Sequence, residues 1–192
     1  MNRSILASTI CALALCLPLA SQASGEKWHV DPVHSSAEFT ATHLMISHVR
    51  GTIPIKDAQI TIPSGSDIPS SVSATLDPKG VDTHNGMRDD DLRSDHFLNI
   101  AADPKMSFES TKITTTDAKH FIIAGNLTMH GQTHPVSLDA QVIGKGPGMK
   151  HEPRIAFTAS GTIDRSQWGM NYGSPVVGNS ITINLEIEAA KE

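Results

Sequence analysis

Cysteine, aromatic residues and positive charge are all scarce in this sequence. Of 192 residues only two are cysteine, Cys11 and Cys16, and 4% are aromatic. Both cysteines lie in an N-terminal segment that we expect to be removed, so we predict no disulfide and no thiol chemistry in the mature chain. Lys and Arg number 15 against 20 Asp and Glu. An acidic chain with few aromatic side chains does not have the composition of a general nucleic-acid-binding protein.

The longest apolar run is too short for a typical membrane span. It extends from Ile5 to Leu19 after a single positive charge at Arg3, and the small residues of Ser21-Gln22-Ala23 follow it. A transmembrane helix needs about 20 apolar residues, whereas this arrangement is typical of a secretory signal peptide. We therefore expect residues 1–23 to be a cleavable signal peptide and residues 24–192 to form a single exported domain, with no stable insertion into a membrane.

Alternating apolar residues indicate that the domain consists of β-strands. The clearest example is residues 121–143, where two alternating runs flank four turn-type residues, 130–133. A period of two points successive side chains to opposite faces, so the segment predicts a hairpin with one buried face. Similar runs predict strands at residues 37–43, 49–62, 72–76, 106–108, 155–163 and 181–187, with a short one at 28–30.

Eight substantial antiparallel strands with one apolar face fit either a β-sandwich or a closed barrel. Within residues 49–62 the apolar positions change from odd to even near Asp57-Ala58, which predicts a β-bulge that bends the sheet. Closure removes exposed sheet edges, and an eight-stranded barrel is about wide enough to hold one small ligand. We therefore favour an all-β, eight-stranded antiparallel barrel, with a packed sandwich as the alternative.

The alternation disappears between residues 77 and 103. Asn85 is a good N-cap for a short helix through residues 87–93, and the acidic residues near its start suit the positive helix end. We expect the insertion at residues 82–97 to cap the mouth of the barrel. Trp168 and Tyr172, in the loop before the last strand, are expected to plug a barrel end rather than to rim the ligand mouth.

Small residues on the predicted inner face suggest a hollow barrel. Alanine and glycine recur there among aliphatic side chains and methionine, and a void lined in this way suits a flexible hydrocarbon chain. The alternative is that the small residues fit the taper of a filled barrel. The residues expected to line a ligand are Ala37, Phe39, Ala41, His43, Ile53, Ala74, Leu76, Phe108, Phe121, Ile123, Leu127, Leu138, Ala140, Phe157, Ala159, Ile183 and Leu185.

An ordered series of motifs runs through the mature chain. It begins with Trp28-x-x-Asp31-x-x-His34-Ser35, continues through Arg88-Asp89-x-x-Leu92-Arg93-Ser94 and Gly125-x-Leu127-Thr128, and ends near Gly161-x-Ile163-x-Arg165. In this series the chain resembles the YceI-like family of exported lipid-binding proteins, from residue 28 to residue 188. The resemblance implies a lipocalin-like barrel that holds a polyisoprenoid, an isoprenoid quinone or a similar long amphiphile. It also implies a periplasmic location and no catalytic reaction.

Four arginines are candidates for contact with the head group of such a ligand, namely Arg50, Arg88, Arg93 and Arg165. The guanidinium group matches the geometry of phosphate and carboxylate oxygens. For Arg88 and Arg93 the alternative is local pairing with the acidic residues of the predicted helix.

Ten histidines raise the question of a metal site. The pairs His43 with His48 and His130 with His134 are four or five residues apart. On an extended strand a separation of four residues is about 13 Å, which is too far for two ligands of one ion. We therefore predict no metal and no cofactor, and expect His34 and His43 to hydrogen-bond within the barrel end.

Motifs of nucleophilic catalysis are missing from the sequence. It contains no Gly-x-Ser-x-Gly and no glycine-rich phosphate loop, and the neighbours His34 and Ser35 would point to opposite faces of a strand. The predicted function is therefore to bind, transport or store a long-chain isoprenoid-type lipid without catalysis. The alternatives are an enzyme of lipid or quinone metabolism that uses His34, His43 or the capping acids, and a histidine-based metal-binding stress protein. An isologous homodimer through an exposed strand is a further option that the sequence leaves open.

Overall fold

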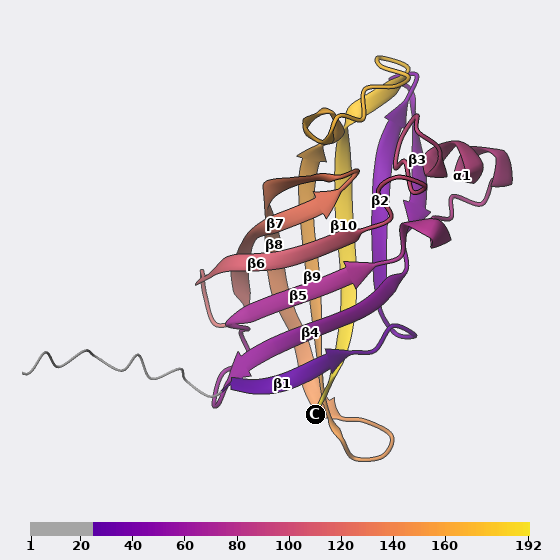
Figure 1. Cartoon of the computed structure of the whole chain (residues 1–192). Coiled ribbons are helices and arrows are strands. Elements are labelled where there is room, and N and C mark those ends of the chain that lie inside the picture. The colour runs from indigo at the N-terminus through magenta and orange to yellow at the C-terminus, as the bar shows by residue number, and fades with distance from the viewer. Residues whose placement is uncertain (1–24) are drawn as a thin grey trace, which may run out of the picture.

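Ten antiparallel strands form one continuous sheet in the computed structural model, which describes residues 25–192 (Figure 1). The predicted signal peptide and both cysteines lie outside the described residues. In chain order the elements are β1 (Gly25–Val30), β2 (Ser36–His43), β3 (Ser47–Thr52), β4 (Ile55–Pro63), β5 (Ser71–Leu76), the 3-10 helix η1 (Pro78–Gly80), α1 (Gly86–Arg93), β6 (Met106–Thr115), β7 (His120–Met129), β8 (Gln132–Pro147), β9 (Pro153–Asp164), the 3-10 helix η2 (Arg165–Trp168) and β10 (Val177–Lys191).

Eight of these strands close into a barrel. Their hydrogen-bonded order is β1-β4-β5-β6-β7-β8-β9-β10, and β1 pairs with β10 to complete the ring. The closing pair is short, with Trp28–Val30 opposite Ala189–Lys191. Because the ring is closed, the prediction of an eight-stranded antiparallel barrel is confirmed and the sandwich alternative is wrong.

The β2–β3 hairpin extends the wall at one end of the barrel. β2 pairs with residues 177–186 of β10, the part of that strand that β1 does not reach. The strand predicted at 49–62 is divided into β3 and β4, since Pro54 has no backbone N–H to give to a ladder. Thr52, the last residue of β3, pairs with Glu38 and also forms a bridge with Asp82. Figure 1 shows the hairpin rising beside β10, with α1 next to β3. The predicted bulge lies slightly earlier than expected, where the register of β4 against β5 shifts between Ile55 and Asp57.

The turns at the two ends of β8 differ from the predicted ones. β7 and β8 pair up to Met129 and Gln132, so this turn contains only His130 and Gly131 rather than residues 130–133. Both residues have positive φ, 48° and 67°, as in the type I′ turns whose twist matches that of the flanking strands. The sequence Gly144-Lys145-Gly146-Pro147-Gly148 also predicts a turn, but β8 continues through it to Pro147.

The short helix forms as predicted. Asn85 is the N-cap of α1, and its side chain accepts a hydrogen bond from the backbone N–H of Arg88 at 3.1 Å. One free donor of the first helical turn is thereby satisfied. Between residues 25 and 192, no helix is both long enough and apolar enough to cross a bilayer.

Two tryptophans are fully buried, each in a different apolar cluster of the barrel. Trp28 packs in the larger cluster with Ile62 and Ile155, and Trp168 packs in the smaller one around Val81. The indole N–H of Trp168 donates to the carbonyl of Leu127 at 3.1 Å, which satisfies its polar atom and fixes the ring. Trp168 is thus a plug, as predicted.

Tyr172 does not share this role. Its side chain is 52% exposed and stacks on His96, with the ring centroids 3.8 Å apart. The ring therefore joins the loop before β10 to the segment after α1, on the outside of the barrel end.

Candidate functional site

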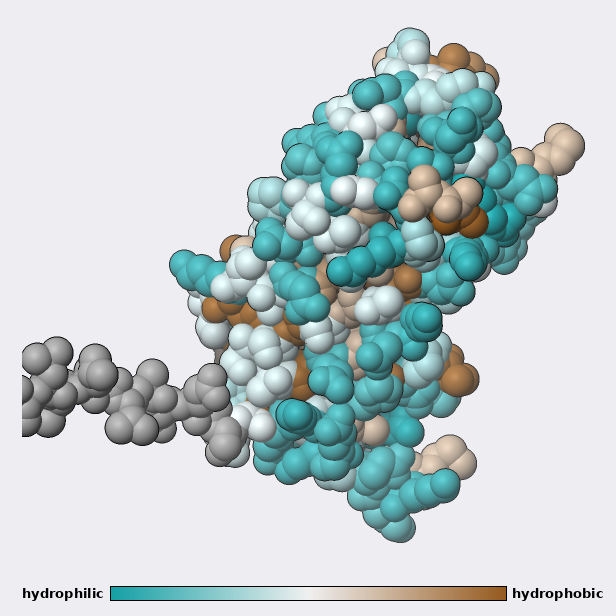
Figure 2. Space-filling view, in the orientation of Figure 1, coloured by the Kyte–Doolittle hydropathy of each residue, from teal (hydrophilic) through white to brown (hydrophobic). Residues whose placement is uncertain are grey.

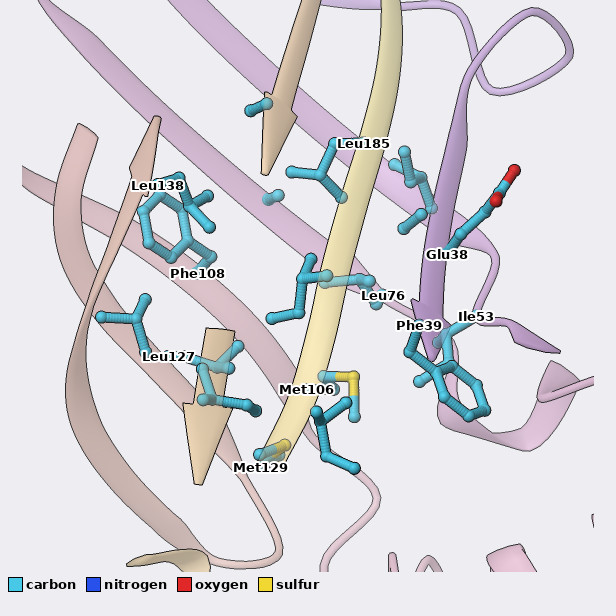
Figure 3. A pocket seen from close by; sticks show the side chains of 18 of the residues that line it. Glu38, Phe39, Ile53, Leu76, Met106, Phe108, Leu127, Met129, Leu138 and Leu185 are labelled. Carbon is cyan, nitrogen blue, oxygen red and sulfur yellow. The ribbon is translucent and has the colours of Figure 1, made fainter. Parts of the chain in front are cut away.

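An apolar cavity of about 260 Å³ occupies the interior of the barrel. Side chains from all eight strands of the ring and from β2 line it (Figure 3). An enclosed group the size of a water molecule needs roughly 10 to 15 Å³ by this measure, so the cavity accommodates about twenty such groups. This capacity corresponds to a ligand of about twenty heavy atoms, enclosed by an almost entirely apolar lining.

Side chains on β10 show directly that the interior is hollow. Ile181, Ile183, Leu185 and Ile187 point inward and border the cavity, yet each remains partly exposed. In a filled core such residues would be buried completely. Their exposed surface faces the cavity, so the reading of a filled, tapered barrel is wrong.

The alanines of the inner face create the space, whereas the glycines do not. Ala37, Ala41, Ala74, Ala140 and Ala159 all border the cavity. Gly125 and Gly161 lie in the same inward-facing rows, but they make room for neighbouring side chains instead. A Cβ added at Gly125 would lie 2.3 Å from the Phe108 ring, and one at Gly161 would lie 2.7 Å from the Leu138 side chain.

Of the residues predicted to line a ligand, all except His43 border the cavity. His43 is the last residue of β2, next to the hairpin turn and beyond the lining of the cavity. The alternation had placed it in the inner row because a period of two gives the face but not the depth at which the cavity ends. The ligand-binding role of the whole set remains a prediction.

The structure adds lining residues that we did not name in the sequence. Some follow the same alternation, including Ile60, Met106 and Met129. Others come from segments without any periodicity and carried no signal. These are Leu92 on α1, Phe97 and Leu98 after it, and Met170 in the loop before β10.

The insertion around α1 and the loop before β10 meet over one part of the cavity. Phe97 contributes to the lining and contacts the edge of Tyr172, with the ring centroids 5.7 Å apart. The stacking of Tyr172 on His96 holds the same two segments together. Residues 82–97 therefore lie where the sequence predicted a cap.

Arg165 is the one predicted head-group candidate that borders the cavity. Its side chain is 3% exposed, and its guanidinium group donates to the carbonyls of Met170 at 2.6 Å, Tyr172 and Val177 at 2.9 Å and Gly178 at 3.1 Å. No ion pair within residues 25–192 includes it, and its burial lowers its pKa below the usual value. Arg165 thus places a positive charge without a carboxylate partner beside an apolar cavity.

Glu38 is the other charged residue at the cavity, but its side chain is exposed. Figure 3 shows it pointing away from the interior, so only the stem of the residue contributes to the wall. The charge in contact with the cavity is therefore that of Arg165.

The other three arginines do not border the cavity. Arg50 is exposed on β3. Arg88 donates to the hydroxyl and the carbonyl of Thr83, both at 2.7 Å. Arg93 pairs with Asp90 at 2.9 Å and also donates to the carbonyls of η1 and the residue after it. The alternative of structural ties is therefore correct for Arg93, and Arg88 is tied to Thr83 rather than to an acid.

Thr83 also binds Asp89, the one acidic residue of α1 that is buried. The Asp89 carboxylate is 6% exposed and accepts hydrogen bonds from the hydroxyl and the backbone N–H of Thr83. These bonds, the hydroxyl bond first, keep the pKa of Asp89 below its usual value. Asp89 therefore ties α1 to Thr83 within the cap.

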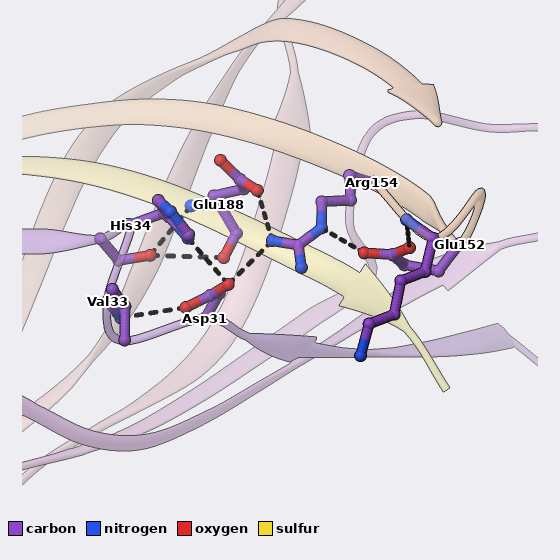
Figure 4. A network of polar contacts seen from close by, with 8 residues as sticks. Asp31, Val33, His34, Glu152, Arg154 and Glu188 are labelled. Carbon is purple, nitrogen blue, oxygen red and sulfur yellow. Dashed lines mark hydrogen bonds and ion pairs between the residues drawn. The ribbon is translucent and has the colours of Figure 1, made fainter. Parts of the chain in front are cut away.

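Neither histidine pair forms a metal site with other ligands in the described part of the chain. The group of metal-ligand type found there is Asp31, His34 and Glu188. Arg154 donates to both carboxylates, at 2.8 Å from Asp31 (Figure 4). Its hydrogen bond is the largest cause of the strongly lowered pKa of Asp31. The group is therefore an ion-pair network.

This network joins the strands where the barrel closes. Asp31 follows β1, Glu188 lies on β10 and Arg154 lies on β9, so the three side chains link the strands beside the short β1–β10 pairing. His34 contacts Asp31 at 2.9 Å, which is the hydrogen-bonding role predicted for it. Lys191 and Glu26 form a further pair at 2.7 Å on the same closing strands.

The sequence matches a known protein family over nearly all of the barrel. The model of the YceI-like domain matches residues 28–189. The chain belongs to the YceI-like family. The match covers almost the whole described part of the YceI-like chain, including the cap and both ends of the barrel.

Individual relatives agree with this assignment. The YceI-like chain is 32% identical over 170 residues to a UPF0312 protein of Staphylococcus epidermidis, covering 86% of this chain and 96% of that one. A YceI protein of Campylobacter jejuni has a similar crystal structure, with a TM-score of 0.70, 28% identity and coverage of 79% of this chain and 90% of that one.

A third protein of similar structure is more distant in sequence. It is a polyisoprenoid-binding domain from Saccharophagus degradans, with a TM-score of 0.62, 11% identity and coverage of 86% of this chain and 98% of that one. At this identity the comparison shows that the two proteins have the same fold.

Proposed function

We propose that this YceI-like protein binds a long-chain lipid of the polyisoprenoid or isoprenoid-quinone type inside its barrel and carries or stores it in the periplasm. The observation that carries the proposal is a hollow, aliphatic interior with room for about twenty methylene-sized groups. Membership of a family that shares its fold with a polyisoprenoid-binding domain supports the choice of ligand class.

Burial of the lipid tail supplies enough affinity without a specific polar contact. Each CH₂ removed from water contributes about 0.8 kcal/mol, so fifteen buried groups contribute a gross value of about 12 kcal/mol. Immobilising the chain and the protein costs several kcal/mol of this. The remainder still corresponds to useful affinity, and its origin in buried area implies tolerance of different chain lengths.

The polar end of the lipid is expected to lie beside Arg165. The rest of the lining is aliphatic, aromatic or thioether, so it offers a head group no other charge. A buried guanidinium without a carboxylate partner attracts an oxygen-rich group through the remaining N–H of Nη1. Phe97, whose ring centroid is 5.5 Å from this guanidinium, borders the same position.

Analysis of the bound lipid tests the proposal. The protein is purified without detergent, extracted with organic solvent, and the extract is examined by mass spectrometry against an extract of the denatured, washed and refolded chain. A stoichiometric isoprenoid-type lipid in the first extract alone is expected. A barrel that is empty after gentle purification and takes up no polyprenol afterwards would overturn the proposal.

The proposed location has its own test. Export with removal of residues 1–23 would give a mature N-terminus at Ser24, which the mass of the intact protein from a periplasmic fraction reports. A full-length chain retained in the cytoplasm would refute this part of the proposal.

A further inference from the structure

The turn between β2 and β3 exposes three consecutive large apolar residues. Leu44 is 52% exposed, Met45 81% and Ile46 84%, and these three residues are called the hairpin tip. Val176 lies beside the tip, is itself 46% exposed, and accepts a hydrogen bond from the backbone N–H of Leu44 at 2.7 Å. Figure 2 shows hydrophobic surface at this end of the molecule, where the hairpin in Figure 1 turns.

The backbone of the hairpin tip is unfavourable for the residues it carries. Leu44 and Met45 have φ values of 51° and 60°. In a left-handed conformation the side chain of an ordinary residue crowds its own backbone, so glycine and asparagine are usual there. Of the six non-glycine residues with positive φ in residues 25–192, these two are the apolar ones. The structure therefore keeps exposed apolar side chains at a cost in free energy, as is typical of functional positions.

The hairpin and the loop before β10 carry no acidic side chain around the tip, although the chain as a whole is acidic. No Asp or Glu occurs between Glu38 and Asp57 or between Asp164 and Glu186, the two segments that form this end. The hairpin itself contributes the exposed Arg50. The acidic helix α1 lies beside β3, short of the turn (Figure 1).

We propose that the hairpin tip inserts into the surface of a phospholipid bilayer that contains anionic lipid. Apolar side chains enter the boundary between head groups and acyl chains, while the guanidinium group of Arg50 contacts lipid phosphates. Tyr172, which is 52% exposed on the adjoining loop, is the kind of amphipathic ring that is enriched at that depth. The hairpin tip would then face the membrane, with the acidic helix α1 set back from it (Figure 1).

This docking role rests on the proposed function, since a carrier of membrane lipid needs a place to exchange it. The two are nevertheless separable, because none of the three tip residues borders the cavity. Changes at the tip therefore leave the cavity lining intact.

The test is co-sedimentation of the purified full chain with vesicles of phosphatidylethanolamine and phosphatidylglycerol, compared with vesicles of phosphatidylcholine alone. The tip variant is Leu44→Asn with Met45→Asn, because asparagine tolerates positive φ and removes the apolar surface. The matched control is Val33→Asn with Met149→Asn, which removes two apolar side chains, 83% and 101% exposed, from the opposite end of the barrel.

We expect the wild type and the control to sediment with the anionic vesicles and to bind phosphatidylcholine less well. The tip variant should lose about tenfold or more in its partition coefficient. It should also unfold at an unchanged or higher temperature and retain as much co-purified lipid, so the loss would not reflect misfolding. If the wild type retains its lipid but sediments with neither kind of vesicle, the docking proposal is wrong and the proposed function stands. Equal binding of the tip variant and the control to anionic vesicles would also overturn it. So would a tip variant that binds vesicles normally but changes from dimer to monomer, because the tip would then contact a second copy of the chain.

Discussion

Replacing Ala74 by leucine should stabilise the empty barrel and weaken its hold on lipid. Ala74 lies on β5 between Ala58 of β4 and Phe108 of β6 and borders the cavity. It is only partly buried because part of its surface faces that space. The substitution adds three carbon atoms to a place that is hollow in the structure.

The magnitude follows from the area that these carbons bury. At about 0.8 kcal/mol for each group, the empty protein should gain up to about 2.4 kcal/mol in its free energy of unfolding. In a filled interior the same change would cost about 1 to 3 kcal/mol through overpacking. The sign of the change therefore reports whether the barrel is hollow. For a lipid that fills the cavity, the loss of three contact groups weakens binding by a similar energy, about fiftyfold.

The assay is urea unfolding of the delipidated protein together with a competition measurement of polyprenol affinity. The control is Ala124→Leu, on the outer face of β7 between Lys112 and Ser137, which should change stability by less than about 0.5 kcal/mol and leave affinity unaltered. An Ala74→Leu protein that is destabilised, or that binds lipid as tightly as the wild type, would refute the reasoning.

Three further predictions concern the ends and the wall of the barrel. Arg165→Lys keeps the charge but loses the planar guanidinium group that donates to four carbonyls. We expect the free energy of unfolding to fall by about 3 kcal/mol or more and amide hydrogen exchange in the loop before β10 to become faster. Unchanged protection of that loop would contradict this. The pKa of Asp31 is lowered from 3.8, chiefly by its bond to Arg154, so Asp31→Asn should lower the melting temperature above pH 4. The difference from the wild type should shrink as the pH falls below 3.8, and a difference that grows on acidification would be inconsistent with the ion pair. Gly125→Ala should cost about 2 kcal/mol or more because its Cβ would meet the Phe108 ring; chemical denaturation measures this, and a neutral result would show that the ring moves freely.

Much of the fold follows from local patterns in the sequence. The period of two along each strand states which side chains share a face, and this information needs no partner strand. All but one of the lining residues that it predicted border the cavity, including the alanines that leave the interior hollow. The cap of α1 by Asn85 is equally local, since donor and acceptor are three residues apart.

The candidate site was less accessible because its polar end depends on contacts between distant segments. Four arginines were candidates in the sequence, and of these only Arg165 is at the cavity, held there by carbonyls of the loop that follows it. The residues of the cap that border the cavity have no periodicity. His43 obeys the alternation but lies beyond the end of the cavity, whose depth is set by the whole barrel.

The sequence by itself determined that the chain makes a one-sided antiparallel sheet with an aliphatic inner face, because alternation and residue size are properties of neighbouring positions. Tertiary structure alone decided that β1 meets β10 to close the ring, that Phe108 fills the space left by Gly125, and that one arginine reaches the cavity. Each of these depends on which distant segments come together. The hydrogen bonds and packing contacts involved join residues far apart in the chain, so the pattern within any one segment does not predict them.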